Sequence, residues 1–206
     1  MKGFDFSKNE IRDLIITFVV LTIAFSILCS EEFSEMPRVI PIVMIAVGLG
    51  SIAHEVAIKM SAMRFNFWAE YKASLPGLFI ATITSFGGFV FSAPGSVYIY
   101  GNANNKQNGL ICLSGVVSNA LLTIVFLVLA VLMRRYGMGI SGLDTALIYD
   151  IFEIGFITNG SMAFFNAFPF NSMDGAAVFK WNPIIWFIMI AFALAIVWVG
   201  QTIFQI

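Results

Sequence analysis

The stretch Gly109–Met133 reads GLICLSGVVSNALLTIVFLVLAVLM, contains no charged residue and is followed directly by Arg134 and Arg135. An α-helix needs roughly 20 apolar residues to cross a hydrocarbon core of about 30 Å. The stretch meets that length, so we expect it to form a transmembrane helix.

The composition extends this expectation to the whole chain. Hydrophobic residues make up 59% of the 206 residues and charged residues only 11%, against roughly 25% charged residues in ordinary soluble domains. The mean hydropathy is +0.91. The formal net charge is -1 and there is no basic run, so the expected partner is the lipid bilayer and not a nucleic acid. Cys29 and Cys112 lie inside apolar runs, which favours buried free thiols over a disulfide.

Apolar runs divide the chain into about five transmembrane helices within one transmembrane domain that covers residues 1–206. The first run could be a secretory signal, but it ends in Leu28, Cys29 and Ser30, which offers no cleavage site with small residues. It is therefore interpreted as a retained helix. The predicted helices cover approximately residues 14–30, 39–60, 109–133, 147–168 and 183–206.

The run Leu75–Tyr100 differs from the others because Pro-Gly and Gly-Gly pairs interrupt it. The residues between these pairs are often β-branched or aromatic, as in Ile80–Thr84. This pattern indicates strands or a broken, membrane-re-entrant element that contains β-structure. Non-helical backbone at membrane depth is tolerated only where protein or a wet cavity surrounds it. A cavity near this segment is therefore expected.

The single histidine, His54, is followed by Glu55 near the end of the second apolar run. Ionisable residues within a membrane segment are costly and are candidates for function. An equally open interpretation is that both lie at the water interface.

A second polar cluster, Asn166–Gly175, follows the run 147–168 and reads NAFPFNSMDG. Pro169 interrupts the helix and Asp174-Gly175 favours a turn. Alone, this cluster is typical of an ordinary exit loop.

Together the two clusters resemble the site-2 protease family of intramembrane zinc metalloproteases. That family carries His-Glu-x-x-His on one core helix and Asn-x-x-Pro-x-x-x-x-Asp-Gly at the end of a later one. The interrupted segment 75–100 and the small-residue stretch Ser114–Asn119 also fit, so the resemblance covers about residues 39 to 182.

The resemblance implies a zinc site with His54 and Asp174 as metal ligands and Glu55 as general base on a zinc-bound water. Asn166 would hydrogen-bond the substrate backbone or a developing oxyanion. The implied activity is hydrolysis of peptide bonds in transmembrane or membrane-proximal segments.

Charge counts predict that the N-terminus is cytoplasmic and that the chain is a multi-pass protein of the cell membrane. Of the 11 Lys and Arg residues, eight fall on the N-terminal side and three on the other. The count is the same whether segment 75–100 crosses the membrane or returns. A metal shared by His54 and Asp174 requires the returning arrangement, because a crossing segment would put them on opposite faces.

One position departs from the family pattern. Ile58 stands where the second histidine is expected, and the chain has no other histidine. Two ligands and waters would hold zinc poorly, so a weak or absent metal is expected unless an unexpected ligand completes the site. The alternatives are an active protease, an inactive pseudoprotease that binds transmembrane helices, and a small-solute transporter, which a broken segment also suits.

Overall fold

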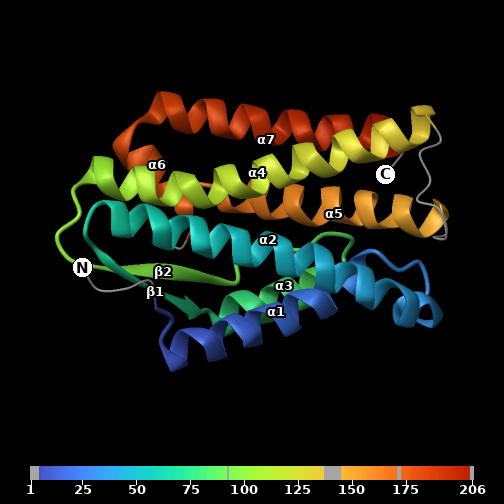
Figure 1. The fold of residues 1–206 in the computed structure, drawn as a ribbon, viewed down its shortest axis with the longest axis horizontal. Coiled ribbons are helices and arrows are strands. Elements are labelled where there is room, and N and C mark those ends of the chain that lie inside the picture. Colours follow the sequence, from blue (N-terminus) through green and yellow to red (C-terminus); the bar gives the residue numbers. More distant parts are fainter. Residues whose placement is uncertain (1–4, 92, 137–144, 171–172, 205–206) are drawn as a thin grey trace.

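The computed structural model describes residues 5–91, 93–136, 145–170 and 173–204. They form a helical bundle with a small two-stranded sheet on one flank (Figure 1). The elements are α1 (Lys8–Leu28), a 3-10 turn (Phe33–Glu35), α2 (Met36–Arg64), β1 (Trp68–Ala73), α3 (Leu75–Ser85), β2 (Gly95–Tyr100), α4 (Asn105–Tyr136), α5 (Thr145–Asn166), α6 (Asp174–Trp181) and α7 (Pro183–Phe204).

Four helices within the described residues are long and apolar enough to cross a membrane. They are α1, α2 together with the turn before it, α4 and α7. The chain is therefore a helical membrane protein. The sequence predicted about five such helices; the fifth, α5, is as long as α7 at 22 residues but is not among these four. It carries Asp150 and Glu153 in its first turns.

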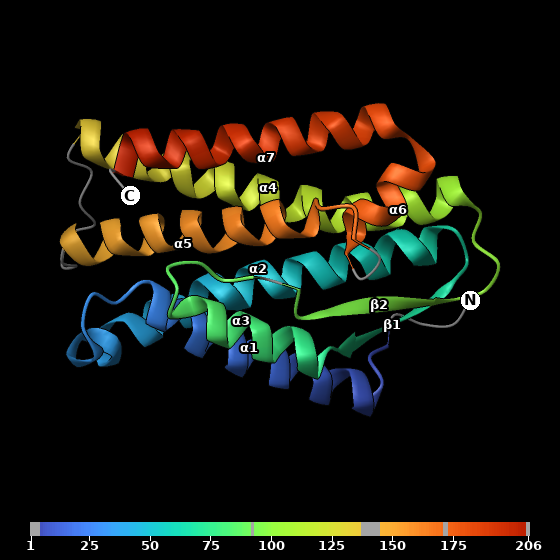
Figure 2. The same cartoon turned by 180° about the vertical axis from the view of Figure 1, so that it is seen from behind.

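The main helices lie side by side along the long axis of the molecule (Figure 1). Helix α4 packs against α2, α5 and α6, and α5 also packs against α7. Helix α1 packs on α2, α3 and β1, on the side of the bundle opposite α7 (Figure 2). The largest cluster of buried apolar residues lies between α1, α2, α3 and α5. A smaller cluster packs α4 against α6 and α7.

Several helix boundaries differ from the predicted ones, including the start of α1, which is Lys8 and not residue 14. Helix α2 begins at Met36 with Pro37 in its first turn, a position that proline favours. Pro41 was expected in the first turn of a helix from residue 39, and it lies instead inside the helix. Helix α4 extends beyond the predicted 109–133 at both ends.

The segment 75–100 is not one helix and contains β-structure at its end, in β2, as expected for its run Val97–Tyr100. The β-branched run Ile80–Thr84 lies in α3, so a strand there is wrong. Helix α3 starts because the Ser74 side chain accepts a hydrogen bond from the Gly77 N–H, 3.2 Å away, which satisfies one of the free N–H groups of a helix start.

The strand in this segment is β2, and its partner β1 precedes the segment. The two strands are antiparallel, with Trp68 opposite Tyr100 and Ala73 opposite Gly95. The chain therefore leaves the sheet at the end of β1 and comes back beside the same point at the start of β2. Helices α2 and α4 are antiparallel, with the end of α2 and the start of α4 at one end of the bundle (Figure 1).

Helix α6 was not predicted, because Asp174-Gly175 was read as a turn in a connection. Asp174 is instead the first residue of α6. A side-chain carbon at Gly175 would come within 2.1 Å of the Ala167 carbonyl oxygen and 2.4 Å of the Phe168 carbonyl oxygen. Glycine therefore allows the start of α6 to lie against the end of α5.

Candidate metal-type site

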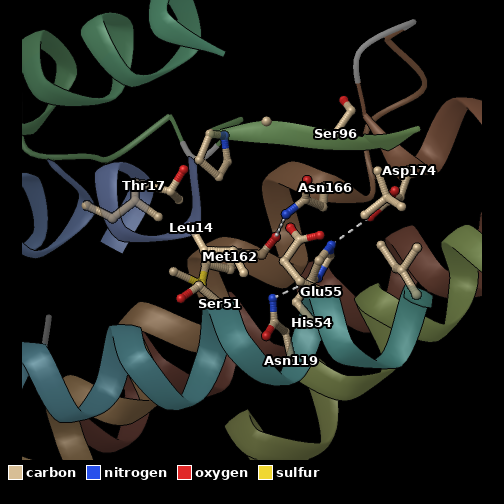
Figure 3. Close-up of a pocket in the computed structure, with 15 residues that line it drawn as sticks. Leu14, Thr17, Ser51, His54, Glu55, Ser96, Asn119, Met162, Asn166 and Asp174 are labelled. Carbon is tan, nitrogen blue, oxygen red and sulfur yellow. Dashed lines mark hydrogen bonds and ion pairs between the residues drawn. The ribbon is translucent and has the colours of Figure 1, made fainter. Parts of the chain in front are cut away.

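The polar residues of the two sequence clusters meet in one cavity lined by α1, α2, α4, α5, α6 and the start of β2 (Figure 3). Helix α2 supplies His54 and Glu55, α5 supplies Asn166 as its last residue, and α6 supplies Asp174 as its first. All four sequence-predicted site residues line this cavity. The start of β2 passes over it, with Ser96 visible above the cavity in Figure 3.

His54 contacts Asp174 directly. The distance from His54 Nε2 to Asp174 Oδ2 is 2.9 Å, and the side chains are 8% and 15% exposed. Apart from this contact, Asp174 Oδ2 is buried with no other partner among the described residues. The contact is possible because Gly175 brings the start of α6 close to the end of α5, beside α2.

The histidine ring fits against α4 because Gly115 has no side chain. A side-chain carbon at Gly115 would lie 2.8 Å from His54 Nε2 and 2.7 Å from Ile58 Cδ1. His54 and Ile58, one turn apart on α2, therefore face the same spot on α4. Ile58 is 2% exposed and packs with Ala62, Ala69 and Ile111.

Glu55 and Asn166 face the cavity from two different helices (Figure 3). Glu55 Oε2 is buried and has no hydrogen-bond partner among the described residues. The Asn166 amide donates to the Met162 carbonyl oxygen in its own helix, over 3.0 Å. The Asn166 amide, which the resemblance predicts to hydrogen-bond the substrate, is thus hydrogen-bonded within α5.

Asn119 is a site residue to which sequence reasoning gave no role. It lies on α4, is 0% exposed, and its Nδ2 is 3.2 Å from His54 Nδ1. The sequence analysis noted it only as part of a small-residue stretch. The available signal was an amide within a long apolar helix, where polar groups are costly.

The donor set does not fit a catalytic zinc with three protein ligands. No group of three or more His, Cys, Asp or Glu side chains in the described part of the chain is placed to hold a metal. Zinc bonds of about 2.1 Å at a tetrahedral angle would separate two ligand atoms by about 3.4 Å. The separation of 2.9 Å between His54 and Asp174 is that of a direct polar contact. Ile58, at the position where the resemblance expects a further ligand, has a buried apolar side chain that cannot ligate a metal.

A curated protein is similar to this chain over most of its length. It is named "Putative zinc metalloprotease MJ0611", from Methanocaldococcus jannaschii, and is 38% identical over 191 residues, which cover 92% of this chain and 93% of that protein. The chain therefore belongs to the metalloprotease family of this archaeal protein. No family model matches the chain, and no solved structure matches it.

Proposed function

We propose that this chain is a multi-pass membrane protein of the site-2 protease type that binds membrane-embedded peptide segments without hydrolysing them. The observation that carries the proposal is Ile58, buried at 2% exposure beside His54. It removes the third zinc ligand while the rest of the polar site is retained. The family and the cavity favour peptide binding, and the donor set opposes metal-dependent hydrolysis.

The hydrogen-bonding character of the cavity supports the same proposal. Glu55 and Asp174 contribute carboxylates, which only accept hydrogen bonds when ionised. The side chains of Ser51 and Asn166 already donate to carbonyl oxygens of their own helices. A tetrahedral oxyanion needs preorganised donors or a cation. These side chains therefore favour groups that donate, such as the backbone N–H of a peptide.

Strand β2 provides a place for an extended peptide. Among the described residues the sheet has two strands, and β1 pairs with one edge of β2. Residues Pro94–Val97 line the cavity at the start of this strand. A peptide that adds to an exposed strand edge satisfies its backbone groups there. In a membrane this satisfaction is especially valuable, because unpaired backbone groups are costly.

The orientation we propose places the N-terminus and the site-bearing end of the bundle in the cytoplasm. Lys8, Lys59 and Lys106 belong to the ends of α1, α2 and α4 that meet at this end, and Arg38 and Arg134 belong to the other. Short cytoplasmic segments carry the excess of Lys and Arg. In this orientation residues 68–100 enter the bilayer from the cytoplasmic side and return to it.

Two measurements on the full-length chain in detergent test the proposal. After equilibration with zinc and removal of free metal, the chain should retain well under one zinc per molecule. A photo-crosslinking amino acid at Ser96 should capture a transmembrane peptide, whereas one at Ile184, which is 72% exposed on α7, should not.

Stoichiometric zinc together with cleavage of the captured peptide would show an active metalloprotease, as the name of the archaeal relative states for that protein. Equal capture at Ser96 and Ile184 would remove the support for a peptide site at β2.

A further inference from the structure

The Asn119 side chain is hydrogen-bonded to one nitrogen of the His54 ring. Its Nδ2 lies 3.2 Å from His54 Nδ1, and both side chains are buried, with Asn119 at 0% and His54 at 6% exposure. The other amide atom, Oδ1, is buried with no partner among the described residues. Figure 3 shows the amide below the ring, with its nitrogen directed at it.

The chemistry of an amide nitrogen decides the proton position on the ring. An amide NH2 group only donates hydrogen bonds. His54 Nδ1 must therefore accept, which leaves the proton of a neutral imidazole on Nε2. That nitrogen faces the Asp174 carboxylate at 2.9 Å. Asn119 therefore donates a hydrogen bond to His54, and His54 donates one to Asp174.

We propose that Asn119 is a positioning residue that fixes His54 in the neutral tautomer with its proton on Nε2. The inference rests on the metal-free site proposed above. In this tautomer the nitrogen that faces Asp174 has no lone pair for a metal. While no third ligand is present, Asn119 thereby holds His54 in its hydrogen bond to Asp174.

The opposite tautomer needs a different amide orientation. A metal on Nε2 would require the proton on Nδ1, and a ligating histidine normally donates that proton to an oxygen acceptor. Turning the Asn119 amide over would present Oδ1 to it. Without a metal, that arrangement would leave a bare Nε2 opposite a carboxylate, two buried acceptors in contact. The observed orientation avoids this.

The chain itself makes the test unambiguous, because His54 is its only histidine. Full-length protein labelled with 15N-histidine, purified in detergent and stripped of metal with a chelator, gives imidazole signals from one residue only. We expect a protonated Nε2 and an unprotonated Nδ1, distinguished by their chemical shifts and their couplings to the ring protons. A protonated Nδ1, with Nε2 either bare or protonated, overturns the proposal.

Variants separate a positioning role from a packing role. Asn119→Ala should give a mixture of the two tautomers. Asn119→Asp should add a proton at Nδ1 while Nε2 keeps its own, because each ring nitrogen then faces a carboxylate, which accepts. Asn159→Ala is the matched control, since Asn159 is also 0% exposed and its Nδ2 donates to the Gly155 carbonyl oxygen over 2.9 Å. This control should leave the His54 spectrum unchanged. A spectrum that responds equally to Asn119→Ala and Asn159→Ala overturns the assignment to Asn119.

Zinc is then added to the wild-type protein as a separate step. A shift of Nε2 on zinc addition refutes the metal-free site and leaves the tautomer of the stripped protein as measured. If the Asn119 variants do not fold, the wild-type spectrum alone supports or overturns the proposal.

Discussion

Lys59 Nζ lies 2.5 Å from Glu10 Oε2, and the two side chains are only 1% and 3% exposed. The other oxygen of Glu10 accepts the Tyr71 N–H over 3.2 Å. One ion pair thus joins α1, α2 and β1 immediately beside Ile58. Its burial makes the removal of one partner costly, because the other is left charged in an apolar site.

Lys59→Met should therefore lower the free energy of unfolding by about 3–5 kcal/mol, measured by denaturation in detergent micelles. Adding Glu10→Gln should recover part of the loss, since no uncompensated charge remains. The control is Arg38→Ala, which breaks a pair with Asp150 whose side chains are 63% and 33% exposed. An exposed pair contributes about 0–1 kcal/mol. Similar losses for the two variants would contradict the burial argument.

The end of α2 and the start of α4 lie at the same end of the bundle (Figure 1). Residues at these two points should therefore be accessible from the same side of the membrane. Single cysteines replacing Arg64 and Asn104, both exposed, should react with a membrane-impermeant maleimide from the same side. A cysteine replacing Ser34 should react from the other side. The measurement uses sealed vesicles of known orientation.

The background for this labelling lacks Cys29 and Cys112, which become alanine. Labelling of the Arg64 and Asn104 positions from opposite sides would rule out the re-entrant arrangement and the proposed orientation with it.

The long helices could be predicted because their signal is local. An uncharged run such as 109–133 is long enough to span a membrane whatever surrounds it. The helical conformation of the run Ile80–Thr84 was harder to predict. Its β-branched residues favour a strand only weakly, and tertiary context overrides that preference. The Ser74 cap and Pro76 in the first turn outweigh it there.

The sequence brought forward four residues that line the cavity, but not their arrangement. His54, Glu55, Asn166 and Asp174 were singled out from two short clusters and the family resemblance, and their roles stay predictions. The role of Gly175 depends on carbonyl groups of Ala167 and Phe168 that approach only in the folded chain. The orientation of the Asn119 amide likewise depends on a ring from another helix.

A substitution at Gly115 tests how tightly α4 packs on the site. Gly115→Ala puts a methyl group within 2.8 Å of His54 Nε2 and 2.7 Å of Ile58 Cδ1. Overpacking of this kind costs about 1–3 kcal/mol, read as a lower midpoint of denaturation. Gly160→Ala is the control, because its nearest neighbours would lie 3.4 and 3.5 Å away and alanine favours a helix. Equal stability of the two variants would show that α4 is free to shift.

Ile58→His restores a ligand-type side chain one turn from His54, on the face that meets Gly115. The zinc content of the purified variant should rise towards one per chain, and cleavage of a membrane-embedded peptide should appear. Glu55→Gln in this background should abolish cleavage and keep the metal, because the proposed role of Glu55 is that of a base and not of a ligand. Asp174→Asn in the same background should reduce the zinc content, since an amide is a poorer zinc ligand than a carboxylate. If the unmodified chain already holds one zinc and cleaves as fast as Ile58→His, then Ile58 does not disable the site. The third ligand must in that case come from a residue other than position 58.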